Sequence, residues 1–307
     1  MRARVLIIVL GTVIAFGVLA LVLAHRRAQF GDALMMAPIW MLSIAVLLQL
    51  TSLVTRTEAW NLCVHAAGGS VERRVVFRAG GVGSLGSVLS GQLGSATRIA
   101  ALRRAAPQTS PRLPALITAE VPTLAVEAVL AAIFTFTLVG PLGLPVWVPI
   151  LVVALMACVV TLLATLARRR RGLWMGLAVL RDLRGRRRLV AMVIIGVLAQ
   201  IARNWLVLRA VGVDASILSA IAVLIVTVSL SALPMGPSVG ATAAVLILGA
   251  HGVAATAAGG LLLTVTGTAG ALCFAGWACG DRVLAGLRNA RLAPVPIIAL
   301  GTAGPPR

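Results

Sequence analysis

The chain has 307 residues, of which 60% are hydrophobic and 11% are charged, and its mean hydropathy is +1.05. This composition excludes a soluble globular protein and predicts one that crosses a membrane several times. The formal net charge of +19 comes from arginines that cluster between apolar stretches. This pattern indicates cytoplasmic loops that contact anionic lipid headgroups, and it does not indicate nucleic acid as a partner.

Six apolar stretches have roughly the 20 residues that a helix needs to cross a bilayer. In chain order they cover about 5–24, 33–54, 113–139, 146–166, 189–209 and 253–279. The second stretch continues as a polar extension with Arg56 and Glu58, which we assign to the membrane interface. It ends at Trp60, a residue type that anchors helices at that interface. The sequence therefore predicts an all-α polytopic membrane protein with six spanning helices.

A glycine-rich segment, 75–104, contains a break that prevents a continuous span. It is interrupted at Ser90-Gly91-Gln92 and has arginine at both ends. Basic residues favour the cytoplasmic side, so both ends are expected on that side. We predict a re-entrant helical hairpin over 75–104. Gln92 at its tip is a hydrogen-bonding candidate or a cap for the freed backbone.

A second break, 231–240, includes Pro234, Gly236 and Gly240 and lies between strongly apolar segments. Proline and glycine do not support a continuous helix. Non-helical backbone at membrane depth is tolerated only where protein covers it or where it lines a water-filled cavity. We predict a second re-entrant hairpin over 215–252, and broken helices of this kind mark substrate sites in transporters.

The distribution of arginine gives the orientation of the spans. The basic segments 98–112 and 168–188 are expected inside, and the uncharged loop 140–145 is expected outside. Both termini then lie inside. Arg26 and Arg27 lie outside in this topology, against the rule.

This topology divides the chain into two halves of opposite orientation, 1–140 and 141–281. Each half contains three spans and one hairpin, and the remaining residues, 282–307, are predicted to be a disordered cytoplasmic tail. Inverted repeats of this kind are common in transporters.

Charged residues within the apolar stretches are the sharpest functional signal, because a charge at the bilayer centre costs at least about 2.5–3.5 kcal/mol. Glu120 and Glu127 are two helical turns apart and share one helix face, with a kink expected at Pro122. Arg98 follows the first break, and Arg203 lies on the fifth span. We predict that these charges line a polar cavity.

Each of these residues also has a structural interpretation. The glutamates can pair with arginines that tie helices together, Arg98 can mark the cytoplasmic side, and Arg203 can extend to the outer interface. Polar residues of the second and last spans, including Gln49, Ser52 and those at 264–270, are assigned to helix packing. The predicted substrate-binding residues are Gln92, Arg98, Glu120, Glu127, Arg203, Pro234, Gly236 and Gly240.

Motifs for catalysis, nucleotides or metals are absent from the sequence. The four cysteines and three histidines are scattered, which predicts neither a disulfide framework nor a metal site. There is no nucleotide-binding loop and no HExxH or GxSxG motif. We therefore predict no enzyme activity and no cofactor. Any transport would be downhill, ion-coupled or coupled through a partner.

Three motifs, in order, match a known family. Gly94-Ser95-Ala96-Thr97-Arg98 matches its Gly-Gly-Asp-x-x-Arg with Ser95 in place of Asp, and Glu120-Val121 matches its Glu-Arg without the Arg. The stretch 234–240 matches its Pro-x-x-Pro-Gly-Gly-x-Gly pattern one residue short, with Ala243 near an expected Glu. The chain thus resembles the flippase-like transmembrane domain of lysylphosphatidylglycerol synthases and its free-standing relatives over about residues 35–280.

The resemblance implies two hairpins that face each other across a bacterial cytoplasmic (inner) membrane. In the synthases this domain is taken to move an aminoacylated phospholipid between leaflets. Our first hypothesis is a translocator that moves a phospholipid or glycolipid headgroup through a polar intramembrane cavity. The alternative, favoured by the missing acidic residues, is a non-catalytic subunit that assists a partner in a membrane complex making a glycolipid or wall polymer. A third hypothesis is an intramembrane enzyme that acts on a polyprenyl phosphate. It is disfavoured because the sequence shows no cluster of carboxylates near an interface.

Overall fold

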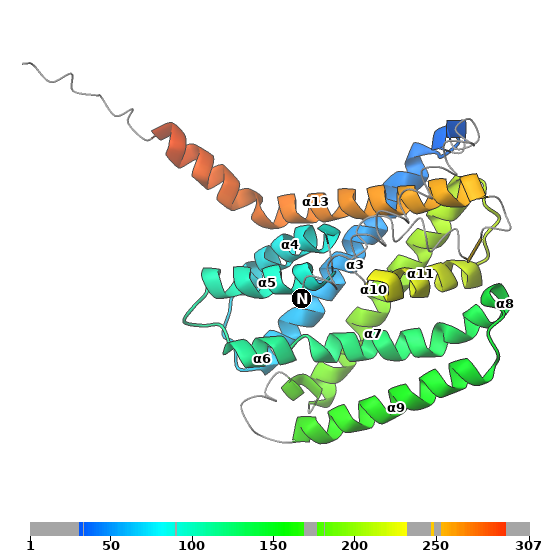
Figure 1. The fold of residues 1–307 in the computed structure, drawn as a ribbon. Coiled ribbons are helices and arrows are strands. Elements are labelled where there is room, and N and C mark those ends of the chain that lie inside the picture. Colours follow the sequence, from blue (N-terminus) through cyan, green and yellow to red (C-terminus); the bar gives the residue numbers. More distant parts are fainter. Residues whose placement is uncertain are drawn as a thin grey trace, which may run out of the picture.

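The computed structural model describes residues 31–32, 34–89, 91–168, 177–180, 182–231, 247–248 and 253–292. The regular elements within these ranges are helices, and no strand occurs among them (Figure 1). In chain order they are α3 (Ile39–Ala66), α4 (Arg73–Leu89), α5 (Gly91–Ala105), α6 (Leu113–Thr118), α7 (Val121–Phe134), η1 (Thr135–Leu138), α8 (Val139–Leu142), α9 (Trp147–Arg168), α10 (Leu183–Ala210), α11 (Ile217–Ser231) and α13 (Val253–Leu292).

Five described helical segments are long and apolar enough to cross a membrane. They are Ile39–Ala66, Leu113–Leu138, Trp147–Thr165, Arg184–Ala210 and Ala255–Gly280. These segments correspond to five of the predicted spans, and the predicted all-α polytopic class is confirmed. The predicted first span, 5–24, lies outside the described residues.

Local sequence signals explain where two of the spans begin. Pro38 has extended backbone in front of α3, so this helix begins at Ile39, later than the predicted start near residue 33. The carboxylate of Asp182 accepts hydrogen bonds from the backbone N–H groups of Arg184 and Gly185 at 3.2 and 2.8 Å. This side-chain cap starts α10 ahead of the predicted start at 189.

The predicted span 113–139 is interrupted in its first third. α6 ends at Thr118, and α7 begins at Val121 with Pro122 in its first turn. Proline has no backbone N–H and clashes with the preceding turn, so the kink predicted at this position is confirmed. Glu120 therefore occupies the junction between the two helices.

α13 continues past the predicted end of the last span at 279 and is helical to Leu292. The added residues include alanine, leucine and arginine, which are strong helix formers. The boundary at 282, where we predicted a disordered tail to begin, therefore falls within this helix. Residues 293–307 lie outside the described part of the chain.

α4 and α5 form a pair of closely packed helices over the predicted hairpin segment 75–104. A Cβ added at Gly94 would lie 2.7 Å from the Cβ of Ser87 and 3.0 Å from the carbonyl oxygen of Gly83. The absence of a side chain at 94 thus permits this close approach of the two backbones. α4 also packs against α13 and α3. The re-entrant course of the hairpin through a bilayer stays a prediction.

The second predicted hairpin, 215–252, is described only in part. α11 packs against α10 and against η1 at the end of α7. Residues 232–246 and 249–252, which include most of the predicted break, lie outside the described residues. In Figure 1, α4 and α5 lie toward the left of the view and α11 lies toward the right. The division into two inverted halves stays a prediction.

The close approach of α4 and α5 gives a test of the hairpin. We expect Gly94→Ala to destabilise the protein by about 1–3 kcal/mol, because the new methyl group overpacks against backbone atoms of α4. Gly276→Ala on α13 is the matched control, because a Cβ there meets nothing within 4 Å. Thermal unfolding in detergent measures both effects. Equal melting temperatures for the two variants would contradict the packing described.

Candidate functional site

An ion pair joins α5 to the start of α7. Arg98 on α5 donates from Nη2 to Oε2 of Glu120, and the two side chains are only 12% and 10% exposed. The guanidinium carbon of Arg98 lies 4.5 Å from the ring centroid of Trp60, which is a cation–π contact. Two predicted site residues are thus brought together. Trp60 joins them, and its assignment as an interfacial anchor is wrong, because it is fully buried.

Two local features position this pair. A Cβ added at Gly83 of α4 would lie 2.7 Å from the Cβ of Arg98, so the missing side chain at 83 lets Arg98 sit against α4. The helix break before Pro122 leaves Glu120 at the N-cap position of α7. Glu120 is 8% exposed there, so its carboxylate meets Arg98 largely away from solvent.

A second ion pair lies two turns further along α7. Arg56 on α3 donates from Nη2 to Oε2 of Glu127 at 2.8 Å, with the side chains 49% and 28% exposed. The charge of Arg56 also acts on Glu120, and that of Glu127 acts on Arg98. These two arginines and two glutamates therefore form one network with no net charge. Sequence reasoning found both glutamates but gave Arg56 no role in the site.

Arg203 lies in a neighbouring polar cluster formed by α10, α3 and α13. Its guanidinium donates to neutral oxygens: Gln49 Oε1 at 2.7 Å, Gln200 Oε1 at 3.1 Å, Thr266 Oγ1 at 3.2 and 3.3 Å, and the backbone carbonyl of Leu263. A Cβ added at Gly267 would lie 3.0 Å from Nη2, so glycine leaves room for this group. Arg203 is 7% exposed, and the interpretation that it extends to the outer interface is wrong.

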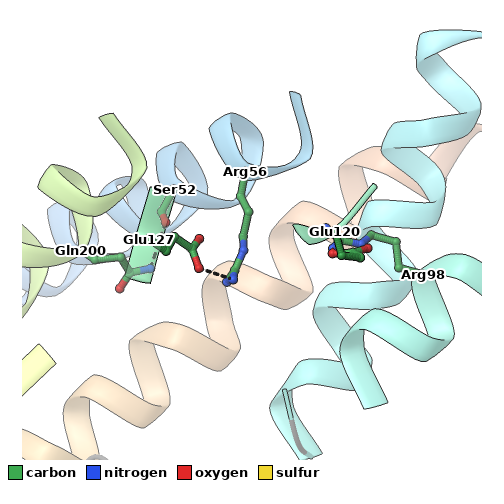
Figure 2. Close-up of polar contacts among 6 residues, drawn as sticks. All are labelled: Ser52, Arg56, Arg98, Glu120, Glu127 and Gln200. Carbon is green, nitrogen blue, oxygen red and sulfur yellow. Dashed lines mark hydrogen bonds and ion pairs between the residues drawn. The ribbon is translucent and has the colours of Figure 1, made fainter. Parts of the chain in front are cut away.

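Gln200 extends this cluster along α3 toward the charged network. Its Nε2 donates to Gln49 Oε1 at 2.9 Å and to Ser52 Oγ at 3.1 Å. Gln49, Ser52, Arg56 and Trp60 follow each other at spacings of three or four residues, which places them on one face of α3. Figure 2 shows the side chains in a row that runs from Gln200 and Ser52 through the Arg56–Glu127 pair to the Glu120–Arg98 pair. We call these six residues the polar row.

Glu58 points to a different set of partners from the polar row. Its carboxylate oxygens accept from Arg73 Nε of α4 and from Arg188 Nη2 of α10, both at 3.0 Å. The Glu58 side chain is 7% exposed, whereas the two arginines are 65% and 56% exposed. Glu58 thus ties three helices together, a role that its assignment to the interface did not anticipate.

The remaining predicted site residues are not part of the polar row. Gln92 lies in the first turn of α5 and is exposed. Pro234, Gly236 and Gly240 lie outside the described residues, so their predicted role is not tested. Among the residues that the structure describes, no group of three or more His, Cys, Asp or Glu side chains could hold a metal ion.

A comparison with known families finds a match over most of the chain. The profile described as the lysylphosphatidylglycerol synthase TM region covers residues 8–276. The chain belongs to this family. The lysylphosphatidylglycerol synthase TM region family was expected from the motifs around Arg98, Glu120 and 234–240, and membership identifies the chain as a multi-pass membrane protein. No curated protein and no solved structure matches the chain.

Proposed function

We propose that this protein moves the headgroup of a phospholipid or glycolipid between the two leaflets of a bilayer. The acyl chains would stay in the surrounding lipid while the headgroup passes along the polar row. The observation that carries the proposal is the series of paired charges, Arg98–Glu120 and Arg56–Glu127, set among apolar helices (Figure 2). Membership of a membrane-domain family whose name refers to a lipid synthase supports a lipid-related role.

The polar row would lower the cost of dehydrating a headgroup. A polar group that loses its hydrogen bonds in apolar surroundings costs roughly 2–7 kcal/mol, depending on the reference state. The more exposed pair, Arg56–Glu127, would meet the headgroup first, since its side chains are accessible. The headgroup would then replace one partner at a time in each pair, so hydrogen bonds are exchanged and not lost.

We place the protein in a bacterial cytoplasmic membrane, with its basic ends against anionic headgroups on the inner side. Arg103 and Arg104 end α5, and Arg186 and Arg187 lie in the first turns of α10, and all four are exposed. Arginines near a membrane surface contribute about 1 kcal/mol each to attraction by anionic lipids. This attraction would fix the orientation of the helices that present the polar row.

Reconstitution tests the proposal directly. The purified protein is placed in vesicles with lipids that carry a fluorophore on one acyl chain, and a membrane-impermeant quencher reports exchange between leaflets. We expect exchange to be faster than in protein-free vesicles and in vesicles with an unrelated multi-pass protein. A rate equal to these controls, together with a stoichiometric partner after mild purification, would replace the proposal by the accessory-subunit alternative.

A further inference from the structure

The buried ion pair of the polar row retains hydrogen-bonding capacity that the protein does not use. Arg98 and the two side chains that it contacts, Glu120 and Trp60, each keep one buried polar atom without a hydrogen-bond partner in the described part of the chain. The atoms are Arg98 Nε, Glu120 Oε1 and Trp60 Nε1. In native proteins the great majority of buried polar atoms have a hydrogen-bond partner, so three unpartnered atoms in one contact group leave room for the polar atoms of a ligand or of water.

The chemistry of these atoms restricts what can bind. Arg98 Nε and Trp60 Nε1 are donors, and Glu120 Oε1 is an acceptor when the carboxylate is ionised. A group that satisfies all three must both accept and donate hydrogen bonds.

An ammonium group does not meet this requirement. It has donors for Glu120 Oε1 but no acceptor for the other two atoms. It would also be repelled by the Arg98 guanidinium that already pairs with Glu120, and by the charge of Arg56 that acts on the same carboxylate.

A phosphate group fails for the opposite reason. Its oxygens can accept from Arg98 and Trp60. However, a phosphodiester monoanion or a phosphate monoester dianion has no donor for Glu120 Oε1, and either anion is repelled by the Glu120 charge. Hydroxyl groups accept and donate at the same oxygen, and they carry no charge. Two neighbouring hydroxyls supply the donor and both acceptors that the three atoms need.

We infer that the group formed by Trp60, Arg98 and Glu120 binds an uncharged, hydroxyl-rich headgroup, such as a sugar or another polyol, on its way along the polar row. This inference rests on the proposed function and names its substrate class. The zero net charge of the two ion pairs suits a headgroup without net charge. A zwitterion such as phosphoethanolamine also has no net charge, so the comparison with phosphatidylethanolamine below separates it from a polyol. The Trp60 ring holds Arg98 in place by the cation–π contact, so the pair is already ordered before the headgroup arrives.

The test compares three acyl-chain-labelled lipids: a glucosyl diacylglycerol, a phosphatidylethanolamine and a phosphatidic acid. Their binding to the full-length protein is measured by native mass spectrometry in detergent, and their exchange is measured in vesicles. We expect binding and exchange of the glucosyl lipid to exceed those of the other two by on the order of tenfold. Equal or weaker binding of the glucosyl lipid would overturn the inference.

Trp60→Phe removes the indole N–H and keeps an aromatic ring beneath Arg98, so the preference for the glucosyl lipid should fall about fivefold. Trp277→Phe on α13 is the matched control, because Trp277 is 68% exposed and lies outside the group. If Trp60→Phe does not fold, Arg98→Lys tests the same point, since it keeps the charge and removes Nε. An unchanged preference in the folded variant would mean that water fills the site, and would overturn the inference.

The two readouts separate this inference from the proposed function. Preferential binding that Trp60→Phe weakens, without exchange of any lipid, would support the headgroup assignment and overturn translocation. Exchange of all three lipids at similar rates, without preferential binding, would support translocation and overturn the headgroup assignment.

Discussion

Replacing Glu120 by alanine is expected to reduce lipid exchange at least tenfold and to destabilise the protein by about 3–5 kcal/mol. The variant leaves the Arg98 guanidinium buried beside Trp60 without its carboxylate partner. Removing one partner of a buried ion pair is costly because the remaining charge has lost its solvent and its counter-ion. Exchange is measured in reconstituted vesicles, and stability by thermal unfolding in the same detergent.

Two further variants separate transport from stability. Glu127→Ala breaks the pair with Arg56, whose side chains are 28% and 49% exposed, so water replaces much of the lost contact. We expect it to cost about 1 kcal/mol or less. The double variant Arg98→Met, Glu120→Leu removes both buried charges, and should regain most of the stability while exchange stays low. Equal losses for Glu120→Ala and Glu127→Ala, or exchange restored by the double variant, would contradict our account of the pair.

Arg203→Met is expected to destabilise the protein by about 3 kcal/mol. Arg203 donates to oxygens on three helices, and its loss removes one donor from each of these acceptors on α3, α10 and α13. Arg203→Lys should recover little, because an ammonium has three donors and lacks the planar fork that reaches both Gln49 and Leu263.

The control for Arg203 lies on the same helix. Arg209 pairs with Asp214 at 3.5 Å, and their side chains are 50% and 93% exposed. Arg209→Met should therefore change stability by about 0.5 kcal/mol or less. Thermal unfolding compares the two variants. A similar effect of both substitutions would show that the buried guanidinium contributes no more than a surface one.

The spans could be predicted because their signal is local. A long apolar stretch specifies a membrane helix by its own composition, and the break at Pro122 follows from the chemistry of a single residue. Glu120 could be singled out as a site residue for the same reason, because a carboxylate in an apolar stretch is expensive wherever it points. Pro38 and Asp182 are the local signals for the late start of α3 and the early start of α10.

The pairing of the site residues depends on contacts that no local pattern specifies. Arg56 meets Glu127 across 71 residues of sequence, and the interface assignment of Arg56 rested on its place at the end of an apolar run. Trp60 is of a residue type that is common at membrane interfaces, yet it is buried and lies against Arg98 of α5. The environment of Arg203 likewise depends on Gln49, which is 154 residues away and on another helix.

Gly270 on α13 has a consequence for how this family can vary. The side chain of Gln49 occupies the space that a Cβ at 270 would take, and the same Gln49 accepts a hydrogen bond from Arg203. A bulkier residue at 270 requires a shorter one at 49, and a shorter residue at 49 deprives Arg203 of an acceptor. We therefore expect positions 49, 203 and 270 to covary, so that homologues keep all three residues or substitute them together.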